Sequence, residues 1–142
     1  MDFPFETEVT DEAGTIEVAR RFSESLQEGD IITLVGNLGS GKTFFVKQVC
    51  SNFGINNASS PSFAIVNRYE NSKTINHFDF YRLKREEELY DLGFEEYVFD
   101  ENVITFIEWA DLMPAIIPRK KIQVTFEITG NVKRKIKIEK YE

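Results

Sequence analysis

The sequence predicts an α/β fold with a mostly parallel central sheet, helices on both faces and antiparallel hairpins at the edges. Two short apolar runs, residues 31–35 and 103–107, are typical of strands buried on both faces of a parallel sheet. A glycine-rich turn and a helical pattern follow the first run directly. Near the C-terminus, polar and apolar residues alternate on either side of Gly130-Asn131, which predicts a hairpin.

The first half of the chain predicts a helix, a strand and a second helix. Thr10 or Asp11 can cap the first helix, which ends before Gly29. The strand over residues 31–35 follows, and the second helix runs from Lys42 to a stop at Gly54. The expected buried positions are Ala13, Ile16, Ala19, Phe22 and Leu26 in the first helix and Phe45, Val46, Val49, Cys50 and Phe53 in the second.

The second half predicts two antiparallel pairs with a helix and a strand between them. Residues 70–73 have the composition of a hairpin turn, and Pro114 and Pro118 mark a connection. The expected elements are strands over 63–69 and 74–80, a helix over 86–92, a strand over 103–107, and strands over 122–128 and 135–139.

The composition indicates one folded domain over residues 1–142. The chain is 42% apolar, which is enough to bury a single core. The longest aliphatic run is far shorter than the roughly 20 residues of a membrane helix. The N-terminal residues are acidic where a secretory signal is basic, so the expected compartment is the cytoplasm.

Charge and residue counts exclude several classes of function. A net charge of −7 disfavours a general nucleic-acid-binding surface. The single Cys50 cannot form an intrachain disulfide, and with the single His77 it cannot build a zinc site. We expect His77 to be structural, because nothing near it in the sequence completes a catalytic pair.

The segment Gly36–Thr43 reads GNLGSGKT and matches G-x-x-x-x-G-K-[ST] at every fixed position. Its glycines let backbone N–H groups point at a phosphate, and the following helix presents its positive end to the same anion. Lys42 supplies a cation for the terminal phosphates, and Thr43 places a hydroxyl on Mg²⁺. The segment therefore predicts a P-loop, and the lack of an N-K-x-D sequence favours ATP over GTP.

Two acidic residues at predicted strand ends are candidates for the chemistry. Glu108 follows the run over 103–107 and is our first choice for the magnesium ligand. Asp79 can hold a metal-bound water or orient the attacking one, and the spacing leaves open which acid does which. The hydroxyls of Ser60-Pro61-Ser62 can sense a terminal phosphate, although an ordinary turn explains this segment equally well.

These motifs together resemble the TsaE (YjeE) family, the ATPases of bacterial tRNA threonylcarbamoyladenosine synthesis. The resemblance covers nearly the whole chain, and its blocks occur in the family's order. Gly36–Thr43 resembles G-D-L-G-A-G-K-T, Ser60–Ser62 resembles S-P-T, His77–Leu83 resembles H-F-D-L-Y-R-L, and Ile107–Trp109 resembles I/V-E-W.

The resemblance implies an ATPase whose hydrolysis supports turnover by TsaD and TsaB, the threonylcarbamoyl-transferring proteins. It implies contact with tRNA only through that complex, no membrane contact, and a monomer when alone. Thr43 and Glu108 would hold Mg²⁺, and Lys42, Glu108 and Asp79 would serve hydrolysis. The implied ATP- and ADP-binding residues are Leu38, Gly39, Ser40, Gly41, Lys42, Thr43, Phe44, Glu12, Thr15, Trp109 and Arg134. Phe44 replaces a Thr of the family and so removes a possible phosphate contact.

Two other functions share the P-loop. A small-molecule kinase would also need an acceptor pocket and a basic lid, for which 142 residues leave little chain. A nucleotide-gated binding module would bind ATP or ADP without useful turnover.

Overall fold

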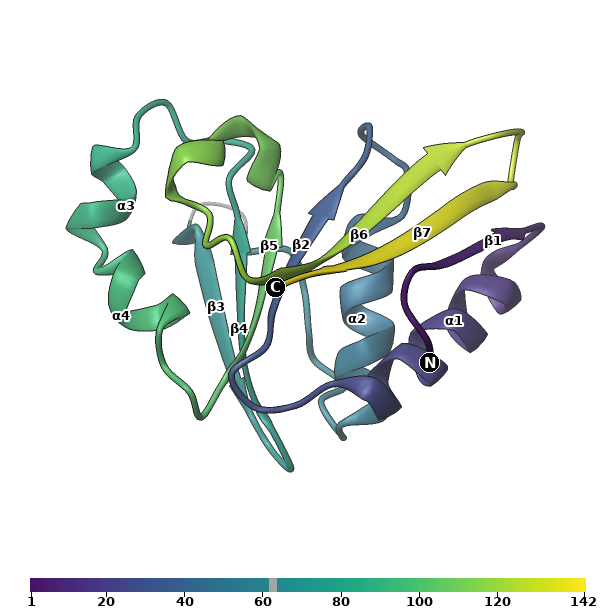
Figure 1. The fold of residues 1–142 in the computed structure, drawn as a ribbon, viewed down its shortest axis with the longest axis horizontal. Coiled ribbons are helices and arrows are strands. Elements are labelled where there is room, and N and C mark those ends of the chain that lie inside the picture. The colour runs from purple at the N-terminus through teal and green to yellow at the C-terminus, as the bar shows by residue number, and fades with distance from the viewer. Residues whose placement is uncertain (62–63) are drawn as a thin grey trace.

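The computed structural model describes residues 1–61 and 64–142, which form one seven-stranded sheet in the order β1-β7-β6-β2-β5-β4-β3 (Figure 1). The central strands β6, β2, β5 and β4 run parallel, and the outer strands pair antiparallel with their neighbours. This confirms the predicted fold class. The strands are β1 (Phe5–Val9), β2 (Ile31–Val35), β3 (Val66–Glu70), β4 (Thr74–Asp79), β5 (Ile104–Glu108), β6 (Lys121–Ile128) and β7 (Arg134–Tyr141).

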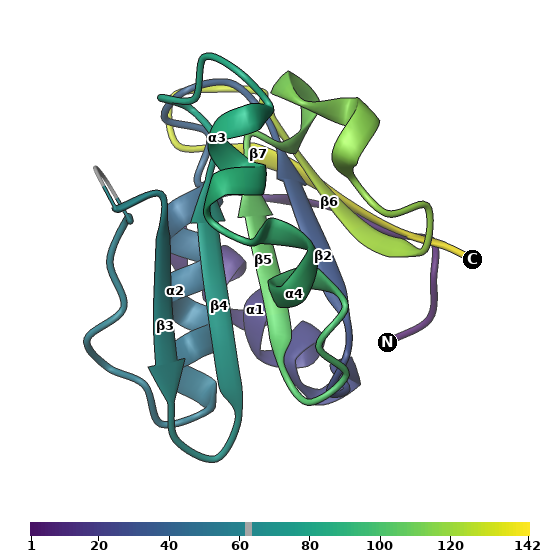
Figure 2. The ribbon, with the colours of Figure 1, turned by 90° about the vertical axis from the view of Figure 1, so that its left-hand side faces the viewer.

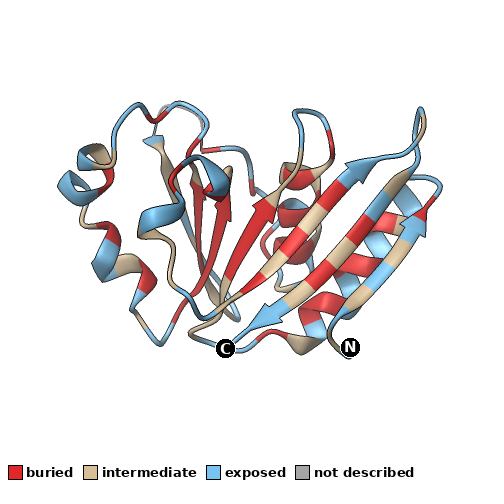
Figure 3. Ribbon diagram, turned by 45° about the horizontal axis from the view of Figure 1, so that its top comes forward, coloured by how far each residue is buried: buried red, intermediate tan, exposed pale blue. Residues whose placement is uncertain are grey.

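Helices cover both faces of the sheet (Figure 2). On one face lie α1 (Glu12–Ser25) and α2 (Lys42–Asn52), and on the other lie α3 (Glu87–Asp91), α4 (Phe94–Val98) and two 3₁₀ turns, Ala110–Leu112 and Pro114–Ile116. The sheet therefore separates two hydrophobic clusters, and β2, β4 and β5 are buried along most of their length, whereas buried residues alternate with less buried ones in the first part of β6 (Figure 3). The part of the chain that the structure describes contains no helix with the length and apolar character needed to cross a membrane.

The first helix differs from its prediction in the face that it buries. Asp11 is the cap, and its carboxylate accepts the N–H of Gly14 at 3.0 Å. Ala19, Phe22 and Leu26 are buried as predicted, but Ala13 and Ile16 are exposed, and Thr15 and Val18 are buried in their place. The reason is β1, which was not predicted from the sequence. A Cβ added to Gly14 would lie 2.9 Å from Val9 Cβ, so the end of β1 fixes the first turn of α1.

The other predicted elements are present, with two changes. The strand predicted over 63–69 begins at Val66, and Ser62 and Phe63 lie outside the described residues. Ile65 has a left-handed φ of 68°, so the extended conformation of β3 cannot include it and the strand begins at Val66. The predicted helix over 86–92 is α3, and the unpredicted α4 begins directly after Gly93, whose left-handed φ of 78° interrupts the helical conformation between them.

The smaller cluster is centred on Phe78, which lies in β4 and is fully buried. Its ring contacts the rings of Phe80, Phe94 and Tyr97 edge to face, with centroid distances of 6.1, 5.2 and 5.3 Å. Because two of these partners belong to α4, Phe78 holds that short helix on the sheet.

We expect Phe78→Ala to lower the free energy of unfolding by about 3–5 kcal/mol, since it leaves a cavity among three rings. Urea denaturation measures this change. Phe99→Ala is the matched control, because the Phe99 side chain is 67% exposed and its removal should change the free energy by less than about 0.5 kcal/mol. Equal effects of the two substitutions would contradict this role of Phe78.

Candidate functional site

The P-loop connects the end of β2 to the start of α2, as the sequence predicts. Gly39 and Gly41 have left-handed φ values of 78° and 109°, and an added Cβ at either would meet nothing within 4 Å. Their requirement for glycine is therefore conformational. At Gly36 the requirement is steric, because a Cβ would lie 2.6 Å from Ser40 Oγ and 2.8 Å from the carbonyl oxygen of Phe126.

Lys42 is buried at the mouth of this loop. Its Nζ donates to the carbonyl oxygens of Gly36 at 2.6 Å and Asn37 at 3.0 Å, and lies 4.0 Å from the ring centroid of Trp109. Burial lowers the pKa of Lys42, whereas the carboxylates of Glu108, Asp111 and Asp79 oppose that shift. The ammonium is thus held between the loop backbone and an indole ring.

Glu108 stands at the end of β5 and is only 2% exposed. The Thr43 hydroxyl donates to this carboxylate and lies 2.8 Å from Oε1 and 2.9 Å from Oε2. The register explains the contact, since β5 pairs with β2 and places Glu108 opposite Leu34, just before the P-loop. The structure therefore brings together the two residues that the sequence analysis assigned to magnesium.

His77 contacts the same carboxylate. On sequence alone this residue is expected to be structural, because nothing near it in the sequence completes a catalytic pair. Its Nε2 lies 2.6 Å from Glu108 Oε2, and its side chain is fully buried. The two residues are 31 positions apart, and the parallel pairing of β4 with β5 brings them together. Alternation along the sequence could place His77 and Asp79 on one face of a strand, but only the register of the sheet shows that Asp79 pairs with Glu108.

Asp79 lies beside Glu108 at the rim of the sheet. Its Oδ1 accepts the N–H of Tyr81 at 3.0 Å, and its Oδ2 accepts the hydroxyl of Ser60 at 3.4 Å. Burial raises the pKa of Asp79 above its ordinary value, and the hydrogen bonds from Tyr81 and Ser60 partly oppose this rise. Ser60 thus reaches the candidate site, and Ser62 of the same predicted segment lies outside the described residues.

A cavity of about 390 Å³ opens among these groups. Most of the predicted site residues line it, together with Tyr81 and Arg82, which were not predicted as site residues although both lie in the His77–Leu83 block. The tyrosine ring stacks at a tilt against Trp109, with 5.0 Å between centroids. The lining consists of Leu38, Gly39, Gly41, Lys42, Thr43, Phe44, Ser60, Asp79, Tyr81, Arg82, Glu108 and Trp109.

Other predicted residues do not line this cavity. Glu12 is exposed in the first turn of α1, and Thr15 is buried one turn later. Arg134 contacts the loop from its carbonyl side: Nε donates to the Ser40 carbonyl at 3.2 Å and Nη2 to the Gly39 carbonyl at 3.3 Å. Arg134 therefore supports the backbone of the P-loop, and Ser40 itself is buried beneath it.

The oxygen groups in the cavity are suited to magnesium. A threonine hydroxyl and a carboxylate are hard ligands, and Mg²⁺ commonly takes its remaining ligands from nucleotide phosphates and water. Among the residues that the structure describes, no group of three or more His, Cys, Asp or Glu side chains could hold a metal ion alone. Thr43 and Glu108 therefore fit a metal that arrives with a phosphate ligand, and do not fit a permanent metal centre.

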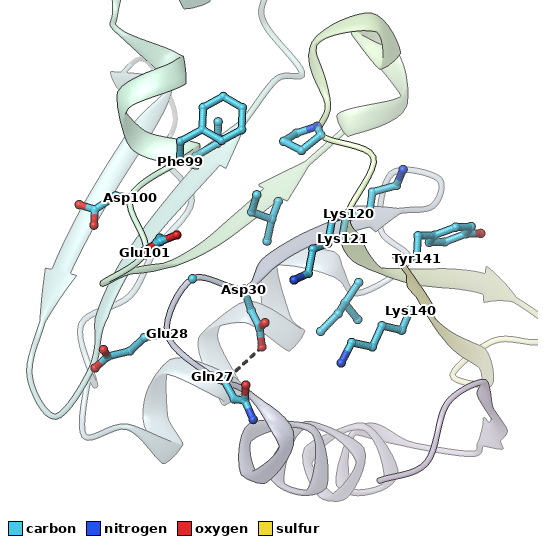
Figure 4. Close-up of a pocket in the computed structure, with 15 residues that line it drawn as sticks. Gln27, Glu28, Asp30, Phe99, Asp100, Glu101, Lys120, Lys121, Lys140 and Tyr141 are labelled. Atoms are coloured by element: carbon cyan, nitrogen blue, oxygen red, sulfur yellow. Dashed lines mark hydrogen bonds between the residues drawn. The ribbon is translucent and has the colours of Figure 1, made fainter.

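A second and larger cavity, of about 560 Å³, lies at the opposite end of the parallel strands (Figure 4). Acidic residues from the loop before β2 and the segment after α4 line one side, and lysines near the start of β6 and the end of β7 line the other. Its size does not make it the candidate site, because the loop N–H groups and the Lys42–Thr43 pair belong to the smaller cavity.

Comparisons with known proteins give matches over most of the chain. The family model described as "Threonylcarbamoyl adenosine biosynthesis protein TsaE" matches residues 9–136. The tRNA threonylcarbamoyladenosine biosynthesis protein TsaE of Rickettsia felis is 40% identical over 129 residues, 89% of this chain and 74% of the relative. The protein of that name from Bacillus subtilis is 34% identical over 121 residues, 84% and 75% of the two chains. The crystal structure of YdiB from Bacillus subtilis has a TM-score of 0.81 at 25% identity, and the match covers 100% of this chain and 88% of that one.

We expect Asp79→Asn to stabilise the protein at neutral pH. The raised pKa means that the ionised carboxylate is less favourable in the folded chain than in the unfolded one. The gain should shrink as the pH falls from the raised value through the unfolded value of about 3.9, because the carboxyl group is then protonated in both states. Urea denaturation of both proteins across this range measures the difference.

The matched control is Asp91→Asn in α3, an exposed position where the free energy of unfolding should change by less than about 0.5 kcal/mol. The amide oxygen that Asp79→Asn introduces can still accept the Tyr81 N–H, so a loss of stability at neutral pH would contradict the effect of burial.

Proposed function

The chain belongs to the TsaE family of threonylcarbamoyl adenosine biosynthesis proteins, and we propose that it binds ATP with Mg²⁺ and hydrolyses it in support of tRNA threonylcarbamoyladenosine modification. One observation carries the proposal. Lys42 and Thr43 of the P-loop converge with Glu108 of β5 on a single cavity, and the acid contacts the threonine directly.

In this proposal the loop N–H groups and the N-terminus of α2 bind the phosphates. Lys42 leaves its carbonyl partners to compensate the terminal phosphate charge, and Thr43 and Glu108 hold the metal. Bound Mg²⁺ supplies charge neutralisation on the phosphate oxygens. Asp79 lies beside Glu108 and accepts a hydrogen bond from Ser60 at the rim of the cavity. We therefore assign to Asp79 the role of orienting the attacking water, from which its carboxylate accepts a hydrogen bond. Water then displaces ADP from the terminal phosphorus, and the products are ADP and inorganic phosphate.

We propose TsaD and TsaB as the partners whose turnover this hydrolysis supports. The relatives are named as proteins of tRNA threonylcarbamoyladenosine biosynthesis. The two partners, TsaD and TsaB, come from the family resemblance. In this proposal the protein works in the cytoplasm, is monomeric when alone, and meets tRNA only through the complex.

Lys42→Ala should reduce phosphate release by about 100-fold or more, because it removes a charge that compensates the phosphates. Thr43→Ala should leave ATP affinity in EDTA unchanged and abolish its tightening by Mg²⁺. Release of free phosphate and calorimetric titration measure these effects, with circular dichroism as the test of folding. Lys47→Ala is the control, since Lys47 is exposed on the same helix.

The same assay separates the proposed function from its alternatives. An ATPase releases free phosphate without an acceptor. The host's TsaB and TsaD should co-purify with the protein, and their addition should increase that release. Transfer of phosphate to a small molecule would indicate a kinase instead. Tight ATP binding with no release, alone and with both partners, would overturn hydrolysis and leave a nucleotide-gated binding module.

Trp109 should report nucleotide binding by its fluorescence. It is the single tryptophan of the chain, and the ammonium of Lys42 lies 4.0 Å from its ring. A phosphate that draws Lys42 away changes the charge next to the indole, so titration with Mg·ADP should change the emission saturably. Lys42→Ala should move the curve to weaker binding. Constant emission while calorimetry records bound ADP would contradict this placement of Trp109.

A further inference from the structure

A buried chain of hydrogen bonds connects His77 to Thr43 through Glu108. A carboxylate only accepts hydrogen bonds, so Nε2 of His77 donates to Oε2 of Glu108 over 2.6 Å. The other ring nitrogen, Nδ1, is buried and has no hydrogen-bond partner among the described residues. The neutral ring with its proton on Nε2 fits both observations, because Nδ1 then carries a lone pair and no donor is left unsatisfied.

The two oxygens of Glu108 have different surroundings. Oε2 contacts both His77 and Thr43, whereas Oε1 contacts Thr43 at 2.8 Å and has no bond to the ring. His77 is fully buried on a central strand, and Thr43 lies in the first turn of α2 and lines the cavity. The histidine is therefore the fixed end of the chain, and it holds the carboxylate through Oε2.

We propose that His77 is a positioning residue for the magnesium ligand. Its Nε2–H fixes Oε2 of Glu108 and so holds the carboxylate against the Thr43 hydroxyl at the cavity. The inference rests on the proposed function, because it requires a nucleotide that binds with Mg²⁺ at Thr43 and Glu108. Residues that hold a metal ligand by a hydrogen bond typically contribute roughly 10–100-fold to metal affinity or activity.

A purely structural role would have different consequences. Asn76, the residue before His77, is equally buried but faces the other side of the sheet, and its side chain has no hydrogen-bond partner among the described residues. Substitutions at either position disturb the same central strand. Only a change at His77 should alter how Mg²⁺ affects nucleotide affinity.

Calorimetric titration of ATP in EDTA and in Mg²⁺ tests this inference with three variants. His77→Phe keeps an aromatic ring but removes the donor, and should reduce the Mg²⁺-dependent tightening about tenfold with affinity in EDTA within about twofold of the parent. His77→Gln carries an amide N–H and should retain most of the tightening. Asn76→Leu, the control for the strand, should retain all of it.

The outcomes separate the two proposals. If Mg²⁺ increases the ATP affinity of folded His77→Phe as much as it increases that of the parent, the positioning role is overturned and the proposed function stands. If the parent binds ATP equally in EDTA and in Mg²⁺, the magnesium site of the proposed function is overturned, and the role of His77 falls with it.

A second measurement needs no variant and decides the matter if His77→Phe does not fold. His77 is the single histidine of the chain, so ¹⁵N-labelled histidine gives one imidazole signal set. We expect the pattern of an Nε2-protonated ring, and a larger shift on binding of ADP with Mg²⁺ than on binding of ADP in EDTA. Identical signals with both forms of bound ADP would overturn the inference.

Discussion

The buried carboxylate of Glu108 is the constraint on which the site depends. A carboxylate that is 2% exposed is strongly unfavourable unless polar groups compensate for the lost water. Here the compensation comes from two directions, a hydroxyl at the start of α2 and an imidazole in β4. These groups meet only if β4, β5 and α2 hold their relative positions, so the chemistry of the site and the register of the sheet are coupled.

Apolar contacts hold α2, the helix that begins with Lys42 and Thr43 of the P-loop, in the required place. The ring of Phe45 lies 5.6 Å from that of Phe22 in α1 and 5.5 Å from that of Phe126 in β6. It thereby joins both helices of that face to the sheet. Arg134 fixes the loop from outside through two carbonyl groups, which leaves the N–H groups of the loop for an anion. Rigid support on several sides is what a phosphate-binding loop needs, because it must present its donors before the ligand arrives.

The sequence predicted the features that short segments determine. A strand, a glycine-rich turn and a helix are local, so the P-loop and the burial of Phe45, Val46, Val49 and Cys50 could be predicted from spacing alone. Contacts that depend on register could not. His77 meets Glu108 because β4 pairs with β5, and no pattern near His77 indicates which strand will be its neighbour.

The first helix illustrates the same limit. Its existence and cap follow from local signals, but its buried face depends on the missed strand β1. The resemblance placed Glu12 and Thr15 near the nucleotide, and neither side chain lines the cavity that the P-loop forms.

The charges around Lys42 connect this architecture to the proposed use of magnesium. The carboxylates of Glu108, Asp111 and Asp79 all oppose the lowering of the pKa of Lys42, and Asp79 and Glu108 line the cavity together with the cations Lys42 and Arg82. In the proposed function, these two carboxylates oppose a nucleoside triphosphate that enters as a free anion. A divalent cation bound to its phosphates reverses that balance, because the carboxylates then attract the complex. In the proposed function the acids near the P-loop would therefore favour metal-bound nucleotide over free nucleotide, and the fold supplies this pair by setting Asp79 and Glu108 side by side at the ends of two parallel strands.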